Sequence, residues 1–126
     1  MRKIEDVILK DGKSLKEVLE LHKKWLEEES GKKADLSCED LSNVDFSNAD
    51  LKGVLLINTD LTGSNLSGVD LTDAKLIDVD LKCAILKDAI LEGAYLEDVE
   101  LTDAYLRYAD FIGAVLIRTY LTDAYF

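Results

Sequence analysis

The sequence predicts an all-β solenoid, in which short coils of chain stack on one another, with an α-helical cap at the N-terminus. Three observations lead to this prediction. A Leu or Phe recurs every five residues from Leu36 to Phe126, a small residue stands two positions before it, and a residue suited to turns stands two positions after it. Repeats this short bury their apolar side chains only by stacking. We therefore expect residues 34–126 to form the solenoid and residues 1–33 to form the cap.

The central residue of each repeat is the primary signal. The series has nineteen positions without a gap, sixteen of them Leu and three Phe. Five residues advance an α-helix by about 500°, which would scatter these side chains around the helix. On a straight strand, an odd spacing would alternate them between two faces. All nineteen side chains share one interior only if the chain bends once per repeat.

The flanking positions agree with this geometry. The residue two positions before the central one points to the same side of an extended segment, and it is Ala ten times and Val five times. The residue two positions after the central one, here called the turn position, is Gly, Asn or Asp at fourteen of eighteen sites. These residues tolerate the left-handed conformation that tight turns use. Each repeat is therefore predicted to be a short extended piece followed by a turn.

Residues 1–33 lack the repeat and contain the signals of a helix. Ser14 and Glu17 form a capping box, which marks a helix N-terminus, and Gly31 is suited to the C-terminal stop. Residues 4–9 are expected to form a short strand before this helix. The apolar residues of the helix are Leu15, Val18, Leu19, Trp25 and Leu26.

The end of a β-helix exposes unpaired backbone and apolar side chains, so a cap is needed. We expect the helix to cover the first coil with Trp25 facing Leu36 and Leu41. Glu39 occupies a position that is otherwise small, so we expect it at the boundary between cap and coil, within reach of a partner or water. His22, the only histidine, falls on the apolar side of the helix and is interpreted as a packed ring.

Charge and composition limit the classes of partner. The 126-residue chain has a net charge of −11, with eighteen Asp or Glu against six Lys or Arg in residues 34–126 and a nearly neutral N-terminal segment. This charge argues against direct nucleic acid binding and favours either a basic protein partner or plain solubility. No apolar run is long enough for a membrane span, and the N-terminus lacks a secretory signal. Cys38 and Cys83 make no disulfide framework, so a cytoplasmic location is expected.

The sequence contains no pattern that indicates catalysis. It has no Cys/His pairing, no cysteines at metal-binding spacing, no glycine-rich phosphate loop and no G-x-S-x-G motif. The serine and threonine side chains stand without a base to activate them. We expect no enzyme activity, no cofactor and no metal site.

The tandem motif A-[DN]-L-x-x resembles that of the pentapeptide-repeat family. Its direct matches are Ala34-Asp35-Leu36, Ala49-Asp50-Leu51 and Ala109-Asp110-Phe111. The resemblance implies a right-handed quadrilateral β-helix with four repeats, or twenty residues, per coil. Residues 34–126 then form about four and two-thirds coils, a stack about 22 Å tall at the usual strand spacing.

Folding the register by twenty residues, as the resemblance implies, places four acidic residues in one column. This acidic column consists of Asp40, Asp60, Asp80 and Glu100, and the next coil continues it with Tyr120. Stacked like charges repel, so one interpretation is a solvated face that discourages association. The other is a surface for a basic protein partner. A calcium site is disfavoured, because one carboxylate per coil supplies too few oxygen ligands.

The same folding gathers exposed apolar side chains on another face. This apolar face consists of Leu55, Ile57, Ile77, Tyr95, Val115 and Ile117. A contiguous apolar patch of this size needs an explanation. Either the N-terminal strand covers it or a partner protein does.

Aromatic residues accumulate in the last coils. This C-terminal aromatic group consists of Tyr105, Tyr108, Tyr120, Tyr125 and Phe126. Aromatic residues are enriched at protein interfaces, and an uncapped end would also expose Leu106, Phe111, Leu116 and Leu121. A homodimer through the C-terminal end is expected, because two such ends related by a two-fold axis would cap each other.

The function predicted from these features is a non-catalytic protein–protein interaction or scaffold module. The alternative comes from the resemblance: some pentapeptide-repeat proteins are similar to B-form DNA in shape and charge and modulate DNA gyrase. Two departures weaken this alternative, since the present stack is shorter and lacks the loops that interrupt those proteins.

Overall fold

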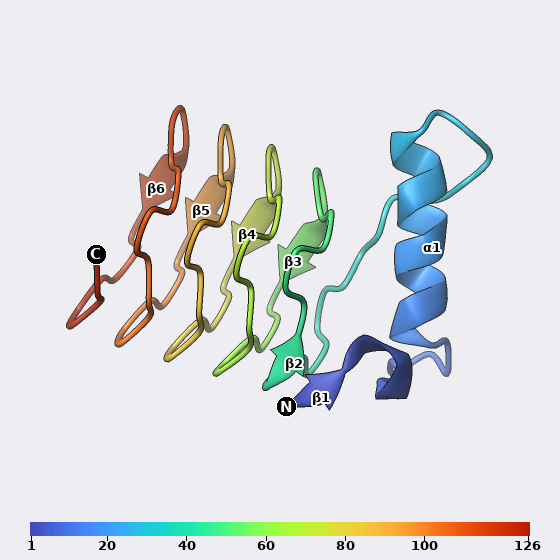
Figure 1. Cartoon of the computed structure of the whole chain (residues 1–126), viewed down its shortest axis with the longest axis horizontal. Coiled ribbons are helices and arrows are strands. Elements are labelled where there is room, and N and C mark those ends of the chain that lie inside the picture. Colours follow the sequence, from blue (N-terminus) through green and yellow to red (C-terminus); the bar gives the residue numbers. More distant parts are fainter.

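The protein is a stack of coils closed at one end by a helix. The computed structural model describes residues 1–126 and places the N-terminal segment at one end of the stack and the C-terminus at the other (Figure 1). The elements in chain order are β1 (Arg2–Lys3), the 3-10 helix η1 (Ile4–Asp6), α1 (Leu15–Leu26), β2 (Val44–Asp45), β3 (Leu55–Ile57), β4 (Lys75–Ile77), β5 (Tyr95–Glu97) and β6 (Val115–Ile117).

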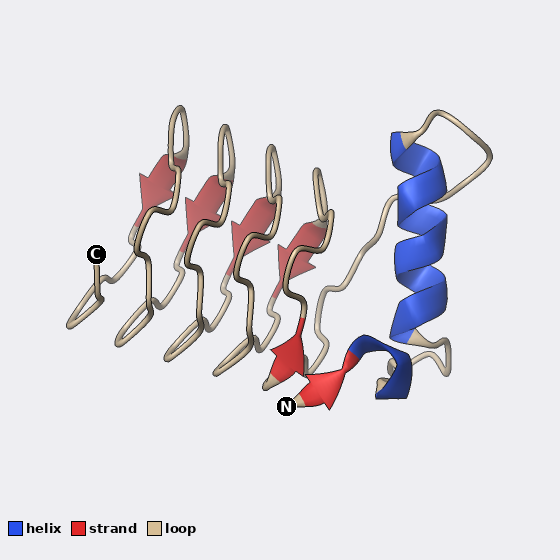
Figure 2. Cartoon of the chain, in the orientation of Figure 1, coloured by secondary structure: helices blue, strands red, loops and turns tan.

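Each coil is twenty residues long, as predicted. Strands β3, β4, β5 and β6 form one parallel sheet in which Leu56 pairs with Leu76 and Leu76 with Leu96. Isolated bridges on the other faces keep the same spacing. The fold is a right-handed quadrilateral β-helix, and most of each coil is turn rather than named strand (Figure 2).

The central residues form the core. Those from Leu36 to Leu106 are at most 2% exposed, and their neighbours at the small position are mostly buried beside them. Leu106 is therefore covered, contrary to the expectation that it lies open at the C-terminal end. In the last coil Leu116 is 41% and Leu121 38% exposed. The core thus ends one coil before the chain does.

The turns have the left-handed backbone that the sequence predicts. All eighteen turn positions have φ between 45° and 72°, including the four that are not Gly, Asn or Asp. Those four are Cys38, Cys83, Tyr108 and Arg118. Side chains with a Cβ pay a steric cost in this region. The stacking of neighbouring coils therefore holds these four residues in a conformation that they disfavour.

Helix α1 begins where the capping box predicts. The Ser14 side chain accepts a hydrogen bond from the Glu17 amide at 3.1 Å. The helix ends at Leu26, and Glu28, not Gly31, adopts the left-handed turn after it, with φ of 59°. Gly31 has a different role, since a Cβ there would lie 2.4 Å from the Leu21 carbonyl oxygen. The predicted stop at Gly31 was therefore wrong, and this glycine instead permits a close chain approach.

The cap covers the first coil with aliphatic side chains rather than with Trp25. Leu15, Val7 and Leu9 are buried in the core cluster, and Val18 and Leu19 pack against it. Trp25 is 40% exposed and lies over Gly53, with ring atoms 3.4 Å from where a Cβ would stand. The expected contact of Trp25 with Leu36 and Leu41 is therefore wrong.

Residues 4–9 do not form a strand. Ile4–Asp6 is the 3-10 helix η1, and Ile8 makes a single antiparallel bridge to Ser14. The strand β1 comes earlier and pairs in parallel with β2 on the first coil. This segment closes the end of the stack, so it does not cover the apolar face.

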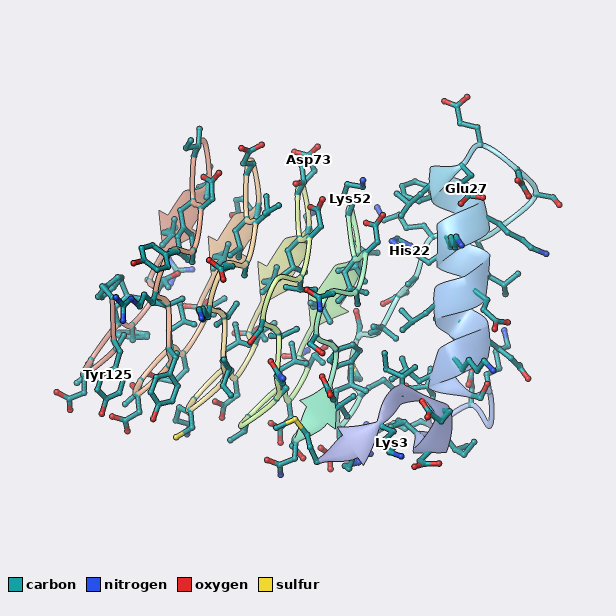
Figure 3. The ribbon with its side chains drawn as sticks, viewed as in Figure 1. Lys3, His22, Glu27, Lys52, Asp73 and Tyr125 are labelled. Atoms are coloured by element: carbon teal, nitrogen blue, oxygen red, sulfur yellow. The ribbon has the colours of Figure 1, made fainter.

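His22 is a buried polar group at the junction of cap and coil. It lies between α1 and the first coil (Figure 3), and its Nδ1 accepts a hydrogen bond from the Ala34 amide at 2.9 Å. Its Nε2 is buried without a partner. Burial lowers the pKa of His22 below its ordinary 6.5, although the Lys52 backbone and the charge of Asp50 oppose this effect. The folded cap therefore favours the neutral ring.

Acidification should loosen the cap through His22. A histidine whose pKa is lowered by folding stabilises the native state above its unfolded pKa, and this contribution is lost as pH falls from 6.5 through the folded value. We expect the free energy of unfolding to decrease as the pH is lowered through that window. The decrease should be much smaller in His22→Asn. Urea titrations followed by Trp25 fluorescence, 5.5 Å from the imidazole, measure this. Equal declines in both proteins would contradict the assignment.

Candidate interaction surfaces

The acidic column is assembled as predicted. Asp40 pairs with Asp60, Asp60 with Asp80, and Asp80 with Glu100 through parallel bridges, and Tyr120 follows. These side chains therefore stand one coil apart along one face of the stack. None of the four is buried.

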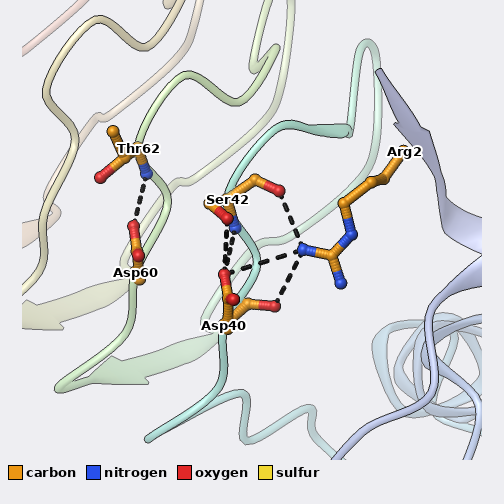
Figure 4. Close-up of polar contacts among 5 residues, drawn as sticks. All are labelled: Arg2, Asp40, Ser42, Asp60 and Thr62. Atoms are coloured by element: carbon orange, nitrogen blue, oxygen red, sulfur yellow. Dashed lines mark hydrogen bonds and ion pairs between the residues drawn. The ribbon is translucent and has the colours of Figure 1, made fainter.

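These carboxylates also bond to the backbone. The Thr62 amide donates to Asp60 Oδ1 at 2.9 Å, and the Ser42 amide donates to Asp40 Oδ1 at 3.0 Å. Figure 4 shows both contacts. The amide and hydroxyl of Thr102 donate to Glu100 in the same way. The acidic column is therefore part of the turn structure and not only a solvent-facing surface.

Sequence reasoning missed this role although the signal was present. Every repeat with Asp, Asn or Glu immediately before its central residue has the amide immediately after that residue bonded to the acidic or amide side chain. The acceptors are Asp35, Asp40, Asp45, Asp50, Asp60, Asn65, Asp70, Asp80, Glu100 and Asp110. Short side chains commonly satisfy a turn amide two residues ahead in this way.

Cations neutralise half of the acidic column. Arg2 lies 3.7 Å from Asp40, and Lys82 lies 3.4 Å from Asp80. The Ser42 hydroxyl and amide hold the pKa of Asp40 below its usual value, with a smaller contribution from Arg2. Asp60 and Glu100 have no cation within ion-pair distance. The column's uncompensated charge is therefore concentrated at these two residues.

The apolar face is a four-stranded parallel sheet with two rows of side chains. Leu55, Lys75, Tyr95 and Val115 form one row, and Ile57, Ile77, Glu97 and Ile117 form the other. Val115 is 46% exposed, and the other members of the apolar face are half-buried by their neighbours within the sheet. The predicted grouping of these six apolar residues is therefore present in the structure.

A polar network borders the apolar face at its C-terminal side. The Tyr95 hydroxyl donates to Glu97 at 3.2 Å, and Arg118 pairs with Glu97 at 3.4 Å and with Asp98 at 2.7 Å. The hydrogen bond from Arg118 lowers the pKa of Asp98. Burial and the bond to Glu97 raise the pKa of Tyr95. These contacts fix the orientation of the one aromatic ring on this face.

The C-terminal aromatic group lies mostly on the sides of the last coils rather than on the end itself. Tyr105 and Tyr125 stack with ring centroids 4.8 Å apart and planes inclined by 10°. Arg107 lies over the Tyr108 ring at 5.1 Å, and Tyr120 continues the acidic column. Phe126 is 76% exposed.

The remaining reactive groups do not assemble into a site. Cys38 and Cys83 are free and exposed, and no three His, Cys, Asp or Glu side chains are grouped to hold a metal ion. None of the helices has the length and hydropathy to cross a bilayer.

A family model described as pentapeptide repeats matches most of the chain with eight copies. The matched segments are 32–63, 40–76, 55–93, 64–103 and 100–126. A search of curated protein sequences finds no match.

Solved structures similar to the protein include the following three. Rfr23 from the cyanobacterium Cyanothece 51142 is 33% identical with a TM-score of 0.71, over 73% of this chain and 63% of that one. HetL from the cyanobacterium Nostoc sp. strain PCC 7120 is a pentapeptide repeat protein involved in heterocyst differentiation regulation. It is 34% identical with a TM-score of 0.69, over 73% of this chain and 44% of that one. QnrB1, a plasmid-mediated fluoroquinolone resistance protein, is 28% identical with a TM-score of 0.67, over 71% of this chain and 46% of that one. The chain thus spans less than two thirds of each.

The turn bonds of the acidic column predict opposite effects of two substitutions. Asp60→Asn with Asp80→Asn keeps the acceptor oxygens and removes like charges, so stability should stay equal or rise. Asp60→Ala with Asp80→Ala leaves two turn amides without their acceptors and should lower stability by about 1–2 kcal/mol. Urea denaturation followed by circular dichroism compares the two proteins. An alanine pair as stable as the asparagine pair would show that these bonds do not support the turns.

Proposed function

Because the chain belongs to the pentapeptide-repeat family, we propose that it acts as a non-catalytic protein-binding module. The observation that carries this proposal is the apolar face on β3, β4, β5 and β6. The N-terminal segment closes the end of the stack and leaves this face open. A contiguous exposed apolar surface on a folded chain commonly marks an interaction site.

The composition of the apolar face suits a protein partner. Six of the eight outward side chains in its two rows are apolar, five of them aliphatic and one a tyrosine, as in the interior of an interface. Lys75 and Glu97 interrupt the rows, and Arg118 paired with Asp98 lies at the border. An ordered flat sheet of this kind offers a rigid surface that binds without a large cost of ordering.

The acidic column is proposed to steer a basic partner toward the stack. Asp60 and Glu100 contribute charge without a paired cation, and residues 34–126 have eighteen Asp or Glu against six Lys or Arg. Fields of this kind raise association rates and lose their effect at high salt. The column therefore contributes orientation, and the apolar face contributes most of the affinity.

An alternative function is modulation of DNA gyrase by mimicry of DNA. The similarity to the fluoroquinolone resistance protein QnrB1 favours it, as do the carboxylates repeated once per coil. Against it stand the short stack, which spans 46% of QnrB1, and the cations that neutralise Asp40 and Asp80.

Self-association through the C-terminal coil is part of the proposal. Two copies related by a two-fold axis would cover Leu116, Leu121 and Phe126, which are exposed in the single chain. The stacked pair of Tyr105 and Tyr125 lies at the margin of such a contact. A closed dimer of this type leaves the apolar face of each copy available.

One set of variants tests the proposed function. Ile57→Lys with Ile77→Lys should abolish capture of a partner from an extract of the source cells, while the Asp60→Asn, Asp80→Asn and Glu100→Gln protein should retain it with a weaker salt dependence. Phe126→Asp should leave capture intact and abolish dimerisation in sedimentation equilibrium. Affinity capture with mass spectrometry identifies the partner, and thermal melting checks that each variant folds.

Two results would contradict this account. A partner retained by the Ile57 and Ile77 variant would show that the apolar face does not bind it. Inhibition or protection of gyrase in a supercoiling assay, lost only in the acidic-column variant, would favour DNA mimicry instead.

A further inference from the structure

A cavity of about 160 Å³ lies between α1, the loop that precedes this helix, and the first coil, and it is partly open to solvent. Its apolar wall consists of Leu9, Val18 and Leu21. The volume is close to that of engineered protein cavities of about 150 Å³ that bind benzene. The cavity therefore has room for one small molecule with a short aliphatic group.

Charged side chains of both signs surround this apolar wall. Four carboxylates and three lysine ammonium groups line the cavity, and none of them forms an ion pair within the chain. Lys33 lies over the Trp25 ring at 5.8 Å, which leaves Lys13 and Lys32 as the cations without a partner. Because the two signs are nearly balanced, the lining favours neither an anion nor a cation, but a ligand that carries both charges.

Glu39 is the lining carboxylate that the coil itself does not need. It occupies the small position of its repeat, where every other repeat has Ala, Val, Thr or Ser, and it is half-buried. The Lys10 amide donates to Glu39 Oε1 at 3.1 Å and so holds the carboxylate beside the cavity. The second oxygen of Glu39 has no partner in the chain and remains available as an acceptor.

The backbone of Asp35 adds an unpaired acceptor and an unpaired donor to the cavity. Leu55, which pairs with Asp35 from the next coil, bonds back to the first coil with both groups: its carbonyl accepts from Leu36 at 2.9 Å, and its amide donates to Ala34 at 3.2 Å. The same two groups of Asp35 point toward the cap, where no coil precedes them, and neither has a partner. Asp35 also lines the cavity, so both groups are available to a ligand there.

We propose that this cavity binds a free α-amino acid with a short aliphatic side chain, such as leucine. The ammonium group of the ligand donates to Glu39 and to the Asp35 carbonyl oxygen, and its carboxylate contacts Lys13 and Lys32. Its side chain packs on the apolar wall. Each charge of the ligand thus meets an opposite charge that has no partner within the chain. The ligand contacts both the cap and the first coil, so its binding stabilises their association.

The ligand chemistry is tested with leucine and three analogues, each of which lacks one part of it. Calorimetric titration of the whole protein with L-leucine should show saturable binding, with the largest changes in amide chemical shift at Asp35 and Glu39. Isoamylamine lacks the carboxylate, isocaproate lacks the ammonium group, and glycine lacks the side chain. Each should bind at least about tenfold more weakly than leucine. The absence of saturable binding at millimolar leucine would overturn the proposal, and so would an analogue that binds as tightly as leucine.

A matched pair of variants locates the site. Glu39→Gln keeps an oxygen that accepts the Lys10 amide but removes the charge, so it should weaken leucine binding at least about tenfold. Glu92→Gln makes the same change at an exposed position on a distant coil and should leave the affinity unchanged. Equal affinities of these two variants would show that the cavity is not the site. The analogue series uses the unaltered protein, so it decides the proposal even if Glu39→Gln fails to fold.

This site is separate from the apolar face and the acidic column. Leucine binding should therefore survive Ile57→Lys with Ile77→Lys, which is expected to abolish capture of a protein partner. Loss of leucine binding in that variant, with its fold intact, would contradict the placement of the site under the cap. The failure of one proposal is thereby distinguished from the failure of the other.

Discussion

The inward packing of one large apolar residue in every five is the interaction on which the rest of the structure depends. Leu36 through Leu106 are at most 2% exposed, which requires the chain to bend after each of them. The bend places every turn position in the left-handed region, even where Tyr108 or Arg118 must adopt it. Once the coils have this shape, their remaining amides and carbonyls point along the axis and bond to the next coil.

That arrangement gives the polar side chains a structural role. The carboxylates of the acidic column accept turn amides, and Arg2 and His22 supply partners that a preceding coil would otherwise supply. The aliphatic side chains of the apolar face on β3, β4, β5 and β6 take no part in this bonding. This face contributes outward-facing apolar side chains that the coil does not need for its own core, which is why it is the stronger candidate for binding a partner.

The sequence was sufficient for features that repeat and insufficient for features that occur once. Nineteen central residues and eighteen turn positions predicted the core and the turns. The resemblance to the pentapeptide-repeat family implied the twenty-residue coil, and with it the grouping of the acidic column and the apolar face. Trp25 was misplaced because helical periodicity gives a face of α1 but not its position over the coil, which Leu15 and Gly31 determine. The turn hydrogen bonds of Asp60 and Asp80 were not predicted, because these residues were interpreted from their charge and not from their position immediately before a central leucine.

The five-residue register is tested most directly by the stability of one core variant against one surface variant. Leu81 is 1% exposed, and Leu81→Asp buries an unpaired carboxylate, a cost of several kcal/mol that is comparable with the whole stability of a small domain. Ile112 is 72% exposed, so Ile112→Asp adds the same charge on the surface. Urea denaturation followed by circular dichroism should find Leu81→Asp unfolded or severely destabilised and Ile112→Asp close to the wild type. A folded Leu81→Asp protein with an unchanged midpoint would contradict the register.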